Sequence, residues 1–268
     1  MCPLSNARST GPPPKDGIPG CTTPHRFMPW ITMVFSSARG MTSRSVASRR
    51  SLTARRSLYL VRPQWRGKGL GLALWKAGIA YLGERTIGLD GVLVQQANYR
   101  KSGFELAYRN VRYEGVARVE QRADDIALVD ARSVPFDHLL AYDTRHFCAP
   151  RAAFLRAWIE QEDAPAIVAM DGDTLRGFGV IRRCRNGHKI GPLFADDIAI
   201  ARTLYRALVR KVPGETVFLD VPESNPAAVA LALEHDMTSV FETARMVTRT
   251  VPDLPLANVF GVTTFELG

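Results

Sequence analysis

The sequence predicts an α/β protein of the α+β class, with mixed sheets flanked by helices. Short runs of β-branched and aromatic residues alternate with segments of helical period, once within residues 58–118 and again within 136–268. The hydrophobic fraction of 46% is enough for an apolar core. No apolar run approaches the ~18 residues that a membrane-spanning helix needs. We therefore expect a globular protein with no membrane partner.

Residues 1–57 differ in composition from the rest of the chain. They hold nine of the 35 basic residues but one of the 26 acidic residues, with no sustained helical or strand period. Three interpretations stay open: a disordered basic tail, an Arg- and Ser-rich transit peptide, or a segment that is not native coding sequence. Because the remaining charge is almost balanced, specific nucleic-acid binding is not expected. A tail that binds polyanions is the weaker alternative.

A glycine-rich loop follows the first predicted strand. Leu58–Val61 contains strong strand formers, and Pro63 ends the strand because proline cannot donate to a ladder. Gly67, Gly69 and Gly71 then allow a tight turn directly before a segment of helical period. Unpaired amides at a helix start carry partial positive charge and bind phosphate or pyrophosphate. The spacing matches neither a nucleotide P-loop nor the dinucleotide fingerprint.

Two motifs together resemble the GNAT family of acetyltransferases. Gln64, Gly67 and Gly69 fall on the fixed positions of its acyl-CoA pyrophosphate loop, Q/R-x-x-G-x-G/A. Residues 99–104, Tyr-Arg-Lys-Ser-Gly-Phe, resemble its second signature, a helix that ends in Y-x-K-x-G-F. The resemblance implies a partial acetyl-CoA-binding domain over residues 58–118.

By this resemblance the chain is an N-acetyltransferase. A substrate amine attacks the thioester of acetyl-CoA directly, and no covalent enzyme intermediate forms. Acetyl-CoA is then a co-substrate, no metal is required, and the partner is a small-molecule amine or an amino group. Leu60 and Val61 are expected to pair with the pantetheine arm. The expected pyrophosphate contacts come from Arg66, Gly67, Lys68, Gly69, Leu70 and Gly71.

Tyr99 is the catalytic acid that the resemblance implies, because the family often protonates the departing thiolate with a tyrosine at this position. A phenol has a pKa of about 10, so it is protonated at neutral pH and can donate to a thiolate. A packing tyrosine at a helix end is the alternative. Asn98 either contacts CoA or serves the turn. No general base is assigned: Asp90 is one candidate, and a solvated loop acid is the other reading of that residue.

A complete domain of this family has further strands and helices before the glycine loop, and these carry much of the acceptor-binding wall. Residues 1–57 do not show that pattern. The first domain is therefore expected to lack its N-terminal elements. The alternative function is a truncated, non-catalytic module or inactive fragment that binds acyl-CoA without transfer.

The second half repeats this order of elements after a linker with a short strand, at residues 119–135. The predicted order is two helices (136–141, 150–161), a hairpin (166–170, 175–183), a strand (189–194), a helix (196–212), a strand (216–221), a helix (226–235) and two strands (239–248, 258–266). It resembles the C-terminal domain of two-domain GNAT proteins, including the YitH-like group. We therefore expect tandem GNAT-like sheets, with a degenerate second domain over 136–268.

The second domain is not expected to hold CoA. Asp196 and Asp197 stand where a glycine loop would be, and as helix caps they would repel pyrophosphate. Asn225 before Pro226 is a predicted N-cap. Several polar residues either face an acceptor cleft or form structural ion pairs and caps: Arg151, Asp220, Glu223, Asn225 and Arg245.

The cysteines and histidines predict no metal site. The four cysteines form no CxxC motif and no Cys/His cluster, which fits a reducing, cytoplasmic protein rather than a disulfide scaffold. His146 and His188 lack a metal-ligand pattern and are expected at the surface or in turns. The sequence indicates neither the acceptor nor the oligomeric state.

Overall fold

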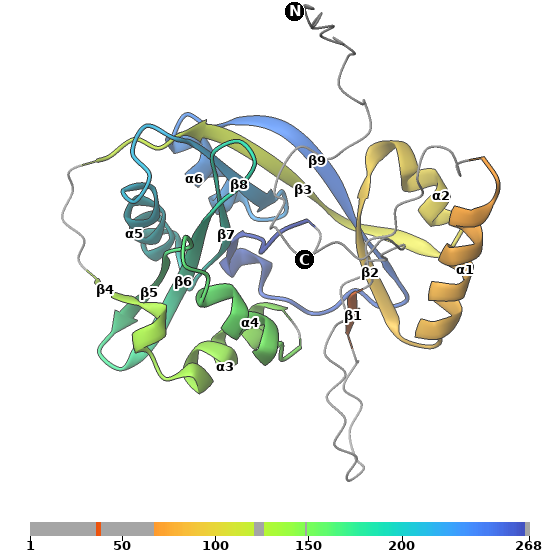
Figure 1. The fold of residues 1–268 in the computed structure, drawn as a ribbon, viewed down its shortest axis with the longest axis horizontal. Helices are drawn as coiled ribbons and strands as arrows, with labels where there is room; N and C mark the ends of the chain where they lie inside the picture. The colour runs from red at the N-terminus through yellow and green to blue at the C-terminus, as the bar shows by residue number, and fades with distance from the viewer. Residues whose placement is uncertain (1–35, 39–66, 121–125, 148, 266–268) are drawn as a thin grey trace, which may run out of the picture.

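The computed structural model describes residues 36–38, 67–120, 126–147 and 149–265, which form one mixed sheet with helices on both faces (Figure 1). Ten strands belong to the sheet, in the order β1-β2-β9-β3-β8-β7-β6-β5-β4, and β10 pairs with β7. The predicted fold class is therefore confirmed. The strands of the two halves join in one continuous sheet.

The first half contributes two helices and three strands to the described part of the chain. They are β1 (Ser36–Ala38), α1 (Leu70–Leu82), β2 (Thr86–Val92), α2 (Gln96–Arg100) and β3 (Phe104–Val116). The predicted helix after the glycine loop is α1, and the predicted short helix before residue 104 is α2. Trp75, Ile79 and Tyr99 cover a small core on β2, β3 and β9.

The second half forms the larger part of the sheet. Its elements are β4 (Ala127–Asp130), α3 (Phe136–Phe147), α4 (Ala152–Ile159), β5 (Ala166–Asp171), β6 (Thr174–Arg183), β7 (His188–Ala195), α5 (Ile198–Val209), β8 (Thr216–Pro222), α6 (Pro226–Glu234), β9 (Thr238–Thr248) and β10 (Val259–Gly261). Each matches a predicted element within a few residues, apart from α3, which ends six residues later than predicted, and the last strand, which is shorter. Gly172, with φ of +56°, makes the predicted hairpin turn between β5 and β6.

Two helix starts in this half show which predicted caps form. The Asn225 side chain accepts hydrogen bonds from the amides of Ala227 and Ala228, as predicted. Asp197 caps α5 by accepting from the amide of Ile200 at 2.9 Å. The prediction that Asp196 also caps this helix is wrong. Its carboxylate turns to the Arg176 guanidinium and the Tyr142 hydroxyl instead.

The two long strands β3 and β9 connect the halves (Figure 1). Strand β9 comes from the end of the chain yet lies between β2 and β3, antiparallel to both. Strand β3 in turn pairs with β8 of the second half. The two halves of the sheet are therefore joined by main-chain hydrogen bonds, through β9 with β2 and β3 and through β3 with β8.

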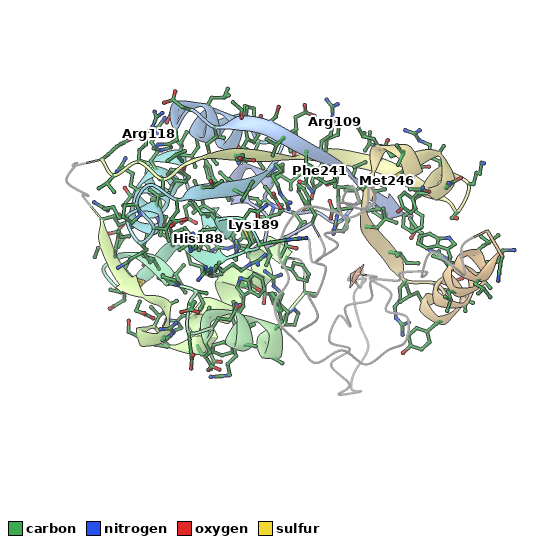
Figure 2. All side chains as sticks on the ribbon, turned by 45° about the horizontal axis from the view of Figure 1, so that its top comes forward. Arg109, Arg118, His188, Lys189, Phe241 and Met246 are labelled. Carbon is green, nitrogen blue, oxygen red and sulfur yellow. The ribbon has the colours of Figure 1, made fainter. Side chains whose placement is uncertain are left out.

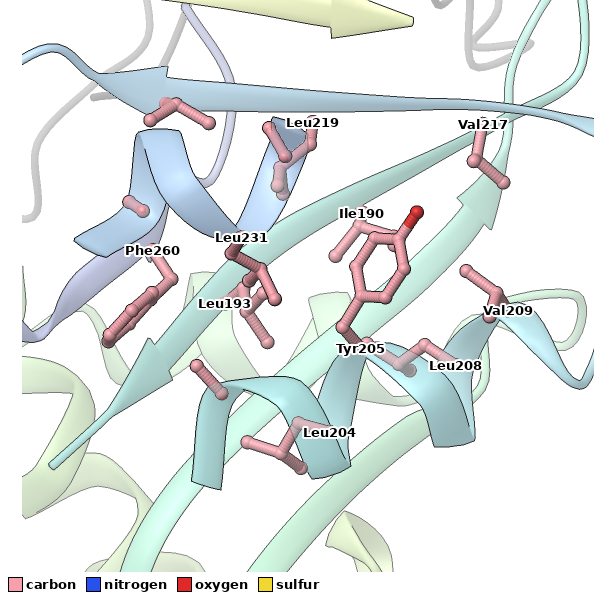
Figure 3. Close-up of a cluster of buried hydrophobic side chains, with 14 of the residues drawn as sticks. Ile190, Leu193, Leu204, Tyr205, Leu208, Val209, Val217, Leu219, Leu231 and Phe260 are labelled. Carbon is pink, nitrogen blue, oxygen red and sulfur yellow. The ribbon is translucent and has the colours of Figure 1, made fainter. Parts of the chain in front are cut away.

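The second half holds two apolar cores, one on each face of the sheet. On one face, the α5 residues Leu204, Tyr205 and Leu208 pack against Ile190 and Leu219 of the strands (Figure 3). On the other face, α3 and α4 cover the sheet with Leu139, Leu155 and Trp158, among others. All these side chains are buried, so this half is the better packed part of the described chain.

His146 lies in the core, so the prediction of a surface or turn position is wrong. Its ring stacks on Phe194 with centroids 4.8 Å apart and lies 4.6 Å from the Tyr142 ring. Nδ1 lies 2.9 Å from the Tyr142 carbonyl oxygen. Burial lowers the pKa of His146 from its ordinary value of 6.5.

We expect His146 to make the protein less stable in mild acid. Because its pKa is lowered in the folded state, its contribution is fully present above about pH 6.5 and is lost as the pH falls through the folded pKa. A His146→Phe variant should therefore show a smaller drop in urea midpoint between pH 7.5 and 5 than the wild type. His138→Gln, at an exposed position, should keep the wild-type drop. Equal drops in the His146→Phe variant and the wild type would contradict this assignment.

Candidate functional site

The glycine loop opens helix α1 in a conformation that suits a ligand. Gly67 and Gly69 both have φ of +74°, in the left-handed region that glycine adopts without strain. Apart from its chain neighbours, no described residue has an atom within 4 Å of a β-carbon placed on either glycine, so the described part of the chain leaves space in front of both. Gly69 is the N-cap of α1 and makes no side-chain cap hydrogen bond. The N-cap residue itself therefore supplies no side-chain cap to the first amides of α1.

The charge around the loop favours an anion. The first turn of α1 contains no acidic residue, and the helix is 13 residues long. Its dipole thus adds positive potential where Leu70 and Gly71 begin the helix. Lys68 lies exposed within the loop and adds a full positive charge. A phosphate or diphosphate group fits this combination of open amides, helix start and lysine.

Tyr99 packs between helix α1, which begins at this loop, and the sheet. Its ring lies 5.6 Å from the Trp75 ring of α1 and 6.3 Å from the Phe104 ring of β3. It also covers Gly91 so closely that a β-carbon there would lie 2.6 Å from the tyrosine ring. Gly91 is thus needed for Tyr99 to lie against β2. These contacts are made by the ring of Tyr99, and its hydroxyl takes no part in them.

The remaining predicted cofactor residues divide into two groups. Asn98 donates a hydrogen bond of 2.8 Å to the Gln95 side chain within the same turn, which fits the structural alternative for this residue. Leu60, Val61 and Arg66 lie outside the described residues. Of the predicted residues, the structure places the loop from Gly67 to Gly71 at the start of α1 and Tyr99 against Trp75 of the same helix.

Asp90 lies in β2 rather than in a solvated loop, so that reading of the residue is wrong. Its side chain is 1% exposed and lies beside Arg245 of β9, at 2.8 Å, and Asn110 of β3, at 2.7 Å. Burial raises the pKa of Asp90, although Arg245 and Asn110 act in the opposite direction. Two neighbouring buried atoms, Asn110 Oδ1 and Thr243 Oγ1, make no hydrogen bond to any of the residues that the structure describes.

A second buried carboxylate forms ion pairs with two basic side chains. Asp220 of β8 accepts bidentate hydrogen bonds from Arg112 at 2.7 and 3.0 Å and also pairs with Lys189. All three side chains are at most 6% exposed. Burial alone would raise the pKa of Asp220, but the charge of Lys189 and the bonds from Arg112 outweigh it and lower the pKa. Arg112 and Lys189 were not predicted as partners, although Asn110 and Arg112 do alternate with apolar residues in the strand.

The other polar residues that could have faced a cleft also form pairs. Arg151 binds Asp143 at 2.6 and 2.7 Å, and both side chains are buried. Glu223 accepts two hydrogen bonds from Arg109, which lies exposed on β3 (Figure 2). Of the two interpretations, structural ion pairs and an acceptor cleft, the first therefore describes Arg151, Asp220, Glu223 and Arg245.

Comparison with known proteins identifies the family. A family profile described as "Acetyltransferase (GNAT) domain" matches residues 139–261. The chain is also 30% identical over 212 residues to the holothin acyltransferase of Pseudoalteromonas sp. (strain SANK 73390), covering 78% of this chain and 71% of that protein. The chain belongs to the GNAT acetyltransferase family. This GNAT protein thus has its profile match in the half that was predicted to be degenerate.

Solved structures share the fold of this GNAT protein. A putative acetyltransferase from Pyrococcus horikoshii aligns with a TM-score of 0.66 at 24% identity, over 79% of this chain and 71% of that one. A tandem GNAT protein from the clavulanic acid biosynthesis pathway aligns with a TM-score of 0.50 at 14% identity, over 73% and 74% of the two chains. At these identities the likeness concerns the fold.

Residues 36–38, 67–120, 126–147 and 149–265 contain no helix with the length and apolar character for crossing a membrane. The same residues bring together no group of three or more His, Cys, Asp or Glu side chains that could hold a metal ion.

Proposed function

We propose that this GNAT protein transfers an acetyl group from acetyl-CoA to an amine. The observation that carries the proposal is the loop from Gly67 to Gly71, with its left-handed glycines, open space and uncapped helix start. These features suit the diphosphate of CoA, which carries negative charge and needs close approach of main-chain amides. CoA would supply the activated acyl thioester.

In the proposed reaction, the amine nitrogen attacks the thioester carbonyl carbon, and the C–S bond then breaks. The departing thiolate takes a proton, for which Tyr99 is the proposed donor. The proton that the amine nitrogen loses passes to solvent, and the Tyr99 phenolate takes a proton back from solvent. A tyrosine hydroxyl is protonated at neutral pH and is therefore available for this step. The packing of Tyr99 against Trp75 and Phe104 fixes its ring beside the helix that begins at the loop.

The relative's name supplies a first acceptor to test. Acetyl-CoA and a panel of amines that includes holothin would be incubated with the protein, and the free thiol and the acetylated product would be measured. Thiol release that depends on both substrates supports transfer. Binding of acetyl-CoA without thiol release for any acceptor would favour the alternative, a module that binds acyl-CoA without transfer.

A Tyr99→Phe variant tests the proton donor. We expect kcat to fall about 100-fold, because a positioned general acid contributes at least that much, while the KM for acetyl-CoA changes little. Tyr81→Phe, at an exposed position of α1, is the matched control and should keep wild-type kcat. A wild-type kcat in Tyr99→Phe would show that Tyr99 only packs.

A further inference from the structure

The second half contains a divergence between β7 and β8 that corresponds to the proposed cofactor position in the first half. The two strands run parallel and pair only over His188–Ile190 of β7, opposite Val217–Leu219 of β8. Helix α5 then follows β7, as α1 follows the glycine loop. We call the space between Gly191–Ala195 of β7 and the end of β8 the second slot.

The chain's own C-terminal segment lies in the second slot. Strand β10 pairs with β7 through Val259 opposite Phe194 and Gly261 opposite Leu193. The next residue, Val262, donates its amide to the Asp220 carbonyl of β8 at 2.9 Å. The segment thus bonds to both diverging strands and takes the main-chain groups that a ligand there would use.

The fit of this segment leaves no room for a second occupant. A β-carbon on Gly261 would lie 2.7 Å from the Leu219 side chain, and one on Gly191 would lie 2.5 Å from the Thr263 carbonyl oxygen. Phe260 is 1% exposed and packs in the core beside Leu193 and Leu231 (Figure 3). The main chain and side chains of the segment therefore occupy the slot in close contact with both strands.

The side-chain amides of two asparagines hydrogen-bond the segment to the starts of α5 and α6. Asn258 donates to the carbonyl oxygens of Ala195 and Asp196, at 3.1 and 2.7 Å. Asn225, which caps α6, donates from its amide to the carbonyl oxygens of Ala257 and Val259, at 3.1 and 3.0 Å. An amide thus lies near the start of α5, where the first half has open space before α1.

We infer that residues 256–265 are a permanent internal occupant of the second slot, so that one chain binds one acyl-CoA. The second half then serves as a strand donor: its β9 lies between β2 and β3 of the first half and brings Arg245 to Asp90. Acyl-CoA binding itself rests on the proposed function. The filling of the slot does not, because it follows from contacts within the chain.

Hydrogen exchange of the free protein tests the filling without any cofactor. The Val262 amide should exchange at least 1,000-fold more slowly than the amides of the exposed turn at Gly172 and Asp173, because it is buried and bonded to Asp220. Asn258→Asp would place a carboxylate against two carbonyl oxygens and should speed Val262 exchange at least tenfold. Asn186→Asp, in an exposed turn, should leave it unchanged. Turn-like exchange of Val262 in the wild type would overturn the inference.

Calorimetry with acetyl-CoA tests the stoichiometry. We expect one equivalent per chain, with binding at least about 100-fold weaker in Gly69→Glu and Val262 exchange unchanged at saturation. A second equivalent, or faster Val262 exchange on adding acetyl-CoA, would overturn the inference. No binding at all, with slow Val262 exchange, would contradict the proposed function and leave the internal occupant supported.

Discussion

Replacing Asp220 with asparagine is expected to lower the free energy of unfolding by about 3–5 kcal/mol, the usual cost of removing one member of a buried ion pair. The substitution keeps the volume but leaves Arg112 and Lys189 buried without their counter-charge. A domain of ordinary stability has about 5–15 kcal/mol in total, so the loss should be plain in the urea midpoint.

A control variant at an exposed ion pair and the dependence on pH both distinguish the buried Asp220 pair from a surface pair. Asp236→Asn removes the carboxylate of an exposed pair with Arg118, more than 60% exposed on both sides, and should leave the midpoint within error. Because the pKa of Asp220 is lowered in the folded state, its contribution is present above about pH 4 and is lost as the pH falls through the folded pKa. The difference between wild type and Asp220→Asn should therefore shrink in acid. Equal midpoints for the Asp220→Asn and Asp236→Asn variants would contradict the buried pair.

Replacing Arg245 with methionine is expected to have a comparable effect, again about 3–5 kcal/mol, because it removes the cation that pairs with the buried Asp90 carboxylate and keeps the hydrogen bond from Asn110. Arg245 belongs to β9 and Asp90 to β2, so the substitution also weakens the pairing between these two strands, which joins the halves. The urea midpoint and the amide exchange of β2 should both report the loss.

The matched control for this variant is Arg109→Met, which removes an arginine of similar size from an exposed pair with Glu223. Its midpoint should stay within error of the wild type. Asp90→Asn added to Arg245→Met should restore part of the lost stability, because no buried charge then stays unpaired. A midpoint for Arg245→Met that equals that of Arg109→Met would contradict a structural role for this pair.

The elements of the second half could be predicted from sequence because each carried its own local signal. The Asp171–Asp173 turn, the Asn225–Pro226 helix start and the period of α5 all depend on residues close in the chain. The glycine loop before α1 was predictable for the same reason. Its resemblance to the GNAT pyrophosphate loop rests on Gln64, Gly67 and Gly69, three residues within six positions.

The strand pairing between the halves could not be predicted, because strands that are far apart in sequence can pair without any local sequence signal. Nothing in residues 238–248 indicates that β9 lies between β2 and β3, more than 120 residues earlier in the chain. The burial of Asp90 and the pairing of Asp220 with Arg112 follow from that topology. His146 was misassigned for a related reason, since its aromatic neighbour Phe194 comes from a distant strand.

We propose that main-chain amides between Gly67 and Gly71 hold the diphosphate of acyl-CoA at the start of α1. Titration calorimetry with acetyl-CoA on the wild type, Gly69→Glu and Gly172→Glu tests it most directly. Gly172 is the matched control, because it too has positive φ and open space but lies in the β5–β6 turn. We expect Gly69→Glu to weaken binding at least about 100-fold, through lost amide contacts and a new negative charge, and Gly172→Glu to bind as the wild type does. No heat with the wild type, or equal affinity in Gly69→Glu, would contradict the claim.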